Sequence, residues 1–313
     1  MREELHSVVA AMGPGRASSS VLSPQTVELL KSLGYVGISA APGYYAGAQE
    51  PLPDPKDRIA LYREFQRALE LQNHGDYRGS AARLEQMASQ DPKLVSVQIE
   101  AGLAFQRLGE DAKAAAHFKA ALRSDPENAV AHYDLAISLG NLHQEVRAVI
   151  ELDVATRIQP WLSQAYTARG LDLATVGKVP EAMASLTRAL QIDPSDFTAW
   201  LNRGKLKIMQ QEWSGAVSDL RHASNLNPES STAHEALGTL AFYQGDLKTA
   251  LAEYRQAVRL NPNSSTAHSS LGLLYSRLGR AADARAQFQR ALALDPKNQD
   301  ALEGIAVTVH HAN

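Results

Sequence analysis

The sequence predicts an all-α fold built from seven helix-turn-helix repeats, and three observations support this prediction. Small side chains alternate with large apolar ones at fixed places within a constant period. Glycine recurs near the middle of most periods. Proline recurs every 34 residues, at Pro92, Pro126, Pro160, Pro194, Pro228, Pro262 and Pro296. A period of this length is typical of a repeat array in which each unit is a pair of helices.

The prolines define the register of the repeats. With each proline at position 32, the repeats begin at Leu61, Val95, Ala129, Ser163, Phe197, Ser231 and Ser265. The proline ends the second helix of each repeat, because its ring biases the preceding residue away from α geometry. Each repeat is therefore expected to run as first helix, turn, second helix and stop.

Four columns of residues describe how the two helices of a repeat pack. Position 8, on the first helix, is always Gly or Ala, and positions 20 and 27, on the second helix, are Ala in six repeats. Between them, position 24 carries Leu84, Phe118, Leu152, Leu186, Leu220, Tyr254 and Phe288. Position 15, where the chain leaves the first helix and needs a left-handed residue, is Gly75, Gly109, Gly177, Gly245 and Gly279. Large side chains are thus predicted to fill the space that small ones leave.

These columns resemble the signature of the tetratricopeptide-repeat (TPR) family, and the resemblance covers residues 61–313. It implies antiparallel helix pairs stacked into a right-handed α-α superhelix, a TPR solenoid. In the family, the first helices line a concave groove that commonly holds a peptide or a helix. The first repeat departs from the pattern, since Arg67 and Ser80 replace apolar or small residues. We therefore expect it to act as a cap, or to have longer or shifted helices.

The expected organisation is an N-terminal arm followed by the solenoid. Residues 1–53 are predicted to contain one or two short helices and a Gly/Pro/Ala-rich linker that includes Tyr44 and Tyr45. Residues 54–313 are predicted to form the solenoid. A half repeat from residue 299 is predicted to be its capping helix.

Part of the arm resembles a second kind of protein. Residues 22–37, together with residues 54–57, are similar to the tail that follows the catalytic domain in bacterial sulfatase-like hydrolases fused to TPR arrays. The nucleophile motif of those hydrolases, Cys or Ser followed by Pro and Arg at two-residue steps, is absent. The resemblance therefore implies an accessory region without hydrolase activity. It also implies a periplasmic or cell-surface location, whereas a free-standing chain is expected in the cytoplasm.

Composition excludes several classes of function. The chain has 31 Lys and Arg against 34 Asp and Glu, and no basic run that would neutralise a track of phosphates, so a nucleic-acid partner is not expected. It has no cysteine, which excludes disulfides and thiolate chemistry. No apolar run reaches the roughly 18 residues that cross a bilayer, and residues 1–6 are acidic where a signal peptide is basic. The chain is expected to be soluble, unexported and not inserted in a membrane.

Candidate chemical groups have simpler structural interpretations. His132, His234 and His268 share position 4, but equivalent positions in successive repeats stack about 10 Å apart, too far to share one metal. We expect them to pack at repeat junctions, and His310 with His311 is only a weak metal motif. Arg169 and Arg203, both at position 7, could bind a ligand carboxylate. We favour the alternative, in which the side-chain stem is buried and the guanidinium group is hydrogen-bonded within the protein. No catalytic residue, metal or cofactor is predicted.

The candidate binding residues occupy first-helix positions that the TPR resemblance points into the groove. They are Ile99, Leu103, Tyr133, Ile137, Leu171, Leu201, Asn202, Lys205, Met209, Phe242, Tyr243 and Leu273. A TPR groove that clamps a C-terminal carboxylate carries several Lys, Asn and Arg residues, a pattern that only Asn202 and Lys205 approach. The groove is predicted to be largely apolar, which suits an amphipathic helix or an extended apolar segment.

The predicted function is a non-catalytic scaffold that binds a protein or peptide segment in this groove. One alternative is a self-assembling homo-oligomer, with arrays stacked end to end or arms swapped. Another is the accessory region of a sulfatase-like hydrolase. The N-terminal arm, with Tyr44 and Tyr45, or a second copy of the chain are rival occupants of the groove.

Overall fold

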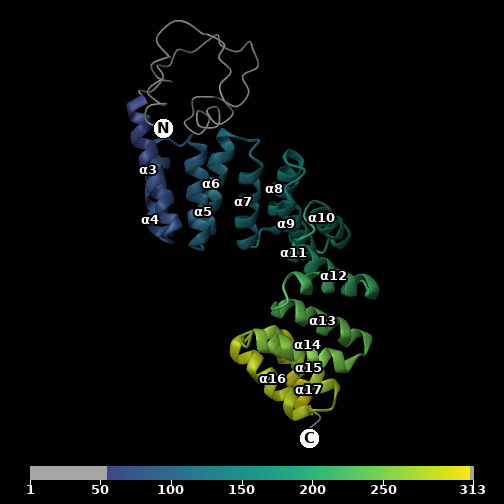
Figure 1. Cartoon of the computed structure of the whole chain (residues 1–313). Coiled ribbons are helices and arrows are strands. Elements are labelled where there is room, and N and C mark those ends of the chain that lie inside the picture. Colours follow the sequence, from purple (N-terminus) through teal and green to yellow (C-terminus); the bar gives the residue numbers. More distant parts are fainter. Residues whose placement is uncertain (1–54, 311–313) are drawn as a thin grey trace. The chain divides into compact units, whose positions relative to one another are not determined.

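The computed structural model describes residues 55–310, and side chains from residue 59 to residue 306. This part of the chain contains fifteen α-helices and no strand (Figure 1). None of these helices combines the length and the apolar character that a bilayer crossing requires. The predicted arm of residues 1–53, including Tyr44, Tyr45 and the segment similar to hydrolase tails, lies outside the described residues, as does His311.

The chain divides into two units, residues 1–66 and residues 67–313, and the second unit contains all the helices from α4 onward. The helices after the first run in order as α4 (Tyr77–Gln90), α5 (Val95–Arg107), α6 (Asp111–Ser124), α7 (Ala129–Asn141), α8 (Glu145–Ile158), α9 (Ser163–Thr175), α10 (Val179–Ile192), α11 (Phe197–Met209), α12 (Trp213–Leu226), α13 (Ser231–Gln244), α14 (Leu247–Leu260), α15 (Ser265–Arg277), α16 (Ala281–Leu294) and α17 (Gln299–His310). The fold is a helix-turn-helix superhelix.

The first helices start where the proline period places them. Helices α5, α7, α9, α11, α13 and α15 begin at position 1 of successive predicted repeats, and α17 begins at residue 299. Side-chain caps explain several of these starts, because the residue before the helix accepts a hydrogen bond from the backbone N–H of position 3. These caps are Asn128, Asp196, Ser230 and Ser264.

The first repeat differs from the others at its start. Helix α3 (Pro55–Asn73) has 19 residues, against 13 in α5, and begins before the predicted repeat start at Leu61. Proline suits the first position of a helix because its missing N–H would have no helical partner there. The first repeat therefore has a longer first helix, one of the two departures expected from Arg67 and Ser80.

The core of each repeat is a large side chain pressed against a glycine or alanine. A Cβ added to Gly102 would lie 2.6 Å from Cε1 of Phe118, and one added to Gly272 would lie 2.6 Å from Cε1 of Phe288. Both phenylalanines are fully buried. In these two repeats position 8 must therefore be glycine, because the phenylalanine ring at position 24 occupies the space that a methyl group would need.

The two kinds of helix form separate layers in the second unit. Each first helix packs against the second helix of its own repeat, and that helix packs against the next first helix (Figure 1). First helices of adjacent repeats also contact one another from α5 to α15, whereas no two second helices of adjacent repeats make contact in the described part of the chain. The first helices thus form the inner layer of the array.

Position 15 requires left-handed backbone in the repeats. Five glycines adopt positive φ angles there, from 72° at Gly279 to 82° at Gly245. In the two repeats without glycine, His143 has φ 56° and Gln211 has φ 60°. These two residues hold a conformation that costs an L-residue about 1–2 kcal/mol.

Replacing His143 by Gly is expected to raise the free energy of unfolding by about 1 kcal/mol, because glycine adopts the left-handed conformation without steric cost. The matched control is Gly177→Ala, where a Cβ meets nothing within 4 Å, so only the backbone conformation is penalised. It is expected to lower the same quantity by about 1 kcal/mol. Urea unfolding measures both, and equal stabilities for both variants and the parent would contradict the backbone explanation.

Candidate functional site

The three histidines at position 4 tie neighbouring repeats together. The Nε2 atom of each lies 3.1 Å from the carbonyl oxygen of the preceding proline, at Pro126, Pro228 and Pro262. The Nδ1 atom of each lies 2.6–2.7 Å from a side-chain oxygen of its own second helix, at Glu151, Glu253 and Gln287. These contacts are those of packing residues at repeat junctions. The described residues contain no group of three or more histidines and carboxylates arranged for a metal.

The hydrogen bond to Glu151 has an electrostatic consequence at His132. It is the largest effect on this imidazole and raises the pKa of His132 above its ordinary value, despite partial burial. A raised histidine pKa means that the interaction stabilises the fold fully below the unfolded pKa and is lost as the pH rises through the folded pKa. The pair is therefore a contact within the repeat that stabilises the fold most at acidic pH.

Arg203 is held by a buried carboxylate. Its Nε and Nη2 atoms donate to Asp219 at 2.7 and 2.8 Å, and Lys207 Nζ lies 2.8 Å from the same carboxylate. Burial would raise the pKa of Asp219, but the hydrogen bonds and charges of Arg203 and Lys207 lower it below its usual range. The guanidinium also lies 4.8 Å from the centroid of the Trp200 ring.

Arg169 is satisfied in the same way inside the array. Its Nε donates to Asp153 at 2.6 Å, and its Nη1 donates to Ser185 Oγ at 2.6 Å. The guanidinium groups of both position 7 arginines therefore bind side chains of neighbouring helices. This agrees with the favoured interpretation, in which these groups are hydrogen-bonded within the protein. Neither head group is presented to a ligand carboxylate.

The predicted groove residues differ in how far they are accessible. Among the apolar ones, Met209 and Tyr243 are the most exposed, at 72% and 62%; Leu273 is exposed as well, and so is Lys205. The half-buried ones are Ile99, Leu103, Tyr133, Ile137, Leu171, Asn202 and Phe242. The inner face thus offers apolar side chains, with the most accessible ones in its C-terminal half.

Two of the predicted residues do not present free side chains. Leu201 is 6% exposed and belongs to a core cluster with Leu220 and Leu240, so the prediction that it lines the groove has to be corrected. That cluster joins α11 to α12 and to the next first helix, α13. Asn202 donates from its amide nitrogen to the carbonyl of Thr198 on its own helix, at 2.8 Å.

An aromatic patch forms around the C-terminal ends of the first helices in the later repeats, and we define it as Trp213, Phe242, Tyr243 and Arg277. The rings of Trp213 and Tyr243 stack with centroids 6.5 Å apart, and those of Phe242 and Tyr243 meet edge to face at 5.9 Å. The Arg277 guanidinium lies 4.8 Å from the Phe242 centroid. Met209 occupies position 13 of the neighbouring repeat, the same position as Tyr243.

A carboxylate strip on the earlier first helices was missed by the sequence analysis, and we define it as Glu100, Asp134 and Asp172. Burial raises the pKa of Asp134 to about 6, and the charge of Glu100 adds to this effect. Burial, assisted by Glu145, also raises the pKa of Asp172 to about 6. Burial raises the pKa of Glu100 as well, although a hydrogen bond from Gln72 opposes it. For all three acids, the folded environment disfavours the ionised form of the carboxyl group.

A signal for this strip was present in the sequence. Glu100 and Asp134 both occupy position 6, which the TPR resemblance already points into the groove beside Asn202. The acids stand out less than the apolar residues of those columns, because an acid on a helix surface is ordinary in a sequence. The burial of these acids, which raises their pKa values, arises only when the helices pack in the folded array.

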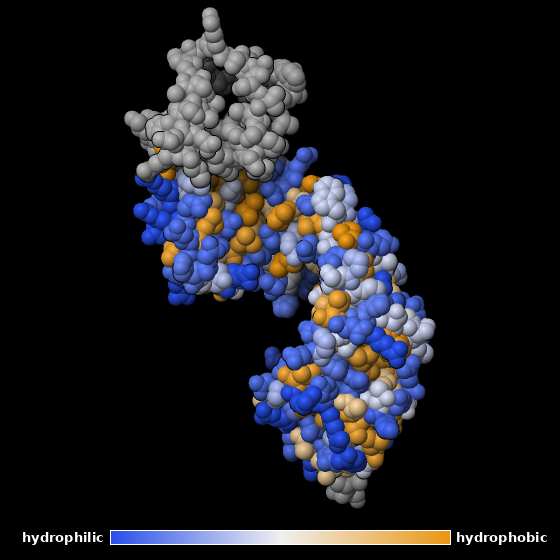
Figure 2. All heavy atoms as spheres, in the orientation of Figure 1, coloured by the Kyte–Doolittle hydropathy of each residue, from blue (hydrophilic) through white to orange (hydrophobic). Residues whose placement is uncertain are grey.

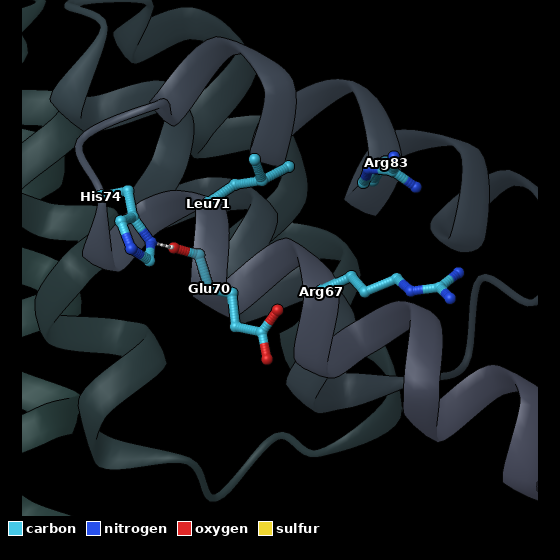
Figure 3. A pocket seen from close by; sticks show the side chains of 5 residues that line it. All are labelled: Arg67, Glu70, Leu71, His74 and Arg83. Carbon is cyan, nitrogen blue, oxygen red and sulfur yellow. Dashed lines mark hydrogen bonds between the residues drawn. The ribbon is translucent and has the colours of Figure 1, made fainter.

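Outside the predicted site residues, the surface has scattered apolar groups and a pocket in the first repeat. On the face drawn in Figure 2, apolar residues of the second unit occur in small groups among hydrophilic ones. One pocket is lined by Arg67, Glu70, Leu71, His74 and Arg83 of the first repeat, where His74 Nδ1 lies 2.7 Å from the Glu70 carbonyl oxygen (Figure 3). It contains none of the predicted site residues.

Comparison with known proteins gives one family and many similar structures. The profile described as "Tetratricopeptide repeat" matches residues 65–129, 99–142, 209–265, 235–299 and 269–313, more than half of the chain. None of the curated proteins matches the chain in sequence.

Three solved structures illustrate the likeness in fold. A tetratricopeptide repeat protein from Parabacteroides merdae has a TM-score of 0.67 and 15% identity, with 80% of this chain and 99% of that chain covered. The APC/C hetero-tetramer Cut9-Hcn1 has a TM-score of 0.67 and 16% identity, with 77% of this chain and 48% of that chain covered. PilW, a type IV pilus biogenesis factor, has a TM-score of 0.60 and 21% identity, covering 68% and 98%. This chain therefore spans about half of the APC/C component.

Proposed function

Because this chain belongs to the tetratricopeptide-repeat family, we propose that it is a non-catalytic scaffold whose inner face holds a segment of a partner protein. Proteins of this family generally mediate interactions between proteins. The observation that carries the proposal is the exposure of large apolar side chains, above all Met209 and Tyr243, at equivalent positions of adjacent first helices. Neighbouring exposed apolar groups of this kind mark interaction surfaces.

The aromatic patch has the chemistry of a binding hot spot. Tyr, Trp and Arg are enriched among the residues that dominate protein interfaces. Tyr and Trp bury much area with few rotatable bonds, and Arg adds a planar group that stacks on aromatic rings. Here Trp213, Tyr243 and Arg277 are already ordered by mutual ring and cation contacts. A partner that docks on them avoids part of the side-chain entropy that binding usually costs. Apolar anchors on a helix or an extended segment fit such a surface.

The test uses a displayed library of random 12-residue peptides as its probe. Met209→Glu combined with Tyr243→Glu is expected to weaken binding of peptides selected on the parent protein by at least about tenfold, because charges replace two apolar anchors. Val146→Glu is the matched control, since Val146 is 65% exposed but lies on the second helix α8. Titration calorimetry gives the affinities, and circular dichroism checks helicity.

The control defines what counts against the proposal. If the double variant binds as tightly as the parent, or if Val146→Glu weakens binding equally, the inner face is not the binding surface. Leu201 is unsuitable for this test because a buried charge there would unfold the repeat.

Two other functions stay predictions. Self-assembly into a homo-oligomer and service as an accessory region of a sulfatase-like hydrolase rest on residues or partners beyond the described part of the chain. The cellular location depends on the second of these and stays a prediction with it.

A further inference from the structure

We infer that the inner face of α5 and α7 receives a Lys or Arg side chain of the partner segment, with Asp134 as its direct counter-ion and Glu100 beside it. The inference rests on the proposed function and specifies which chemistry the partner must carry. It concerns the earlier first helices, whereas the aromatic patch lies on α12, α13 and α15.

Asp134 is a buried anion without a partner. The residue is only 8% exposed, and within the described part of the chain its carboxylate makes no hydrogen bond and no ion pair. Among the described side chains, the only fully enclosed polar atom without a partner is Ser80 Oγ. The oxygens of Asp134 are therefore not sealed off, and a group that approaches the inner face can reach them.

Asp219 shows what a buried carboxylate looks like when its role is structural. It is 2% exposed and is bound by both Arg203 and Lys207. The chain thus supplies two cations to one buried acid in the later repeats and none to Asp134. Since buried charges in proteins are normally paired, the partner of Asp134 is expected to come from outside the chain.

The charges near Asp134 and Asp172 favour a cation. The neighbouring charge that acts on Asp134 is Glu100, and the one that acts on Asp172 is Glu145, so both are negative. A metal ion is a poor fit, because no three acidic or histidine groups of the described residues are arranged to hold one. A single organic cation that enters between first helices would relieve this repulsion.

Nearby apolar residues suit the stem of a Lys or Arg side chain. Leu103 follows Glu100 by three residues on α5, and Ile137 follows Asp134 by three residues on α7. Residues three apart on a helix share a face. Both side chains are half-buried, so an alkyl stem could lie on them while its charged head reaches the carboxylates. The fitting partner is a segment with a basic residue near one end and apolar anchors near the other.

The experiment selects the same random 12-residue library on the parent protein and on Asp134→Asn. The parent is expected to enrich Lys or Arg at one fixed distance from apolar residues, and the variant is expected to lose that enrichment while it keeps the apolar anchors. For one selected peptide, replacing its basic residue by norleucine should weaken binding to the parent by about tenfold and binding to Asp134→Asn much less. Glu100→Gln is a second variant, expected to show a smaller loss.

Loss of binding by Asp134→Asn is not expected to come from unfolding, because the substitution removes a disfavoured buried charge. The melting temperature of the variant, compared with that of the parent, checks this. If the parent selects peptides without basic residues, or if Asp134→Asn binds the basic peptide as tightly, the inference is overturned and the scaffold proposal stands. If the parent enriches no peptide at all, both are overturned.

Discussion

Replacing Asp219 by Asn is expected to lower the free energy of unfolding by roughly 3 kcal/mol, since removing one member of a buried ion pair leaves the others uncompensated. Asp219 accepts from Arg203 at two atoms and from Lys207 at a third contact. The variant leaves both cations partly buried without a counter-charge. Urea unfolding at neutral pH measures the loss.

The matched control for this substitution is Asp283→Asn. Asp283 pairs with Arg280 at 2.6 Å, but both side chains are nearly half exposed, so solvent screens the pair. The control is expected to change the free energy of unfolding by less than about 0.5 kcal/mol. Equal losses in the two variants would show that the Asp219 cluster is not a buried ion pair. Because the pKa of Asp219 is lowered in the fold, its contribution is present above the unfolded pKa and fades as the pH falls through the folded pKa.

Replacing Asp134 by Asn is expected to have the opposite effect, with a pH dependence of its own. The pKa of Asp134 rises from 3.8 to about 6 on folding, so the folded chain binds its proton more tightly than the unfolded chain does. The parent therefore loses stability as the pH rises through this interval, and the variant does not. Two pKa units correspond to roughly 3 kcal/mol, of which about 2 kcal/mol should develop between pH 4.5 and pH 8.

The measurement is the difference in free energy of unfolding between Asp134→Asn and the parent at those two pH values. It should grow in favour of the variant as the pH rises. Any constant cost of the amide cancels in this comparison, and Asp283→Asn again serves as the exposed control. A difference that stays constant would mean that Asp134 is not a disfavoured buried anion, and would weaken the case for an external cation.

The repeat architecture was predictable because every repeat has to satisfy the same local constraints. Pro126 and its equivalents stop the second helices, and residues such as Gly102 give way to the ring of Phe118. The start of α3 at Pro55 was not set by this period, since no preceding repeat ends there. The left-handed turns at His143 and Gln211 follow from their shared position 15, although neither residue is a glycine.

The sequence indicates which side of a first helix each candidate residue occupies, but not how deeply its side chain is buried. A helical period tells which side chains share a face, and it places Met209 and Tyr243 on the inner layer. It does not tell how closely the neighbouring helices approach, and Leu201 is in fact buried in a core cluster with residues of α12 and α13. The same packing depth turns Asp134 from an ordinary surface acid into an unpartnered buried one.

The central claim, that the inner layer of first helices holds the partner segment, is tested most directly by photocross-linking. A library-selected peptide that carries a benzophenone group is bound, irradiated, digested and analysed by mass spectrometry. The account predicts cross-links on α5, α7, α9, α11, α13 and α15, with Met209 among the modified residues. Cross-links confined to the second helices α6, α8, α10, α12, α14 and α16 would contradict it.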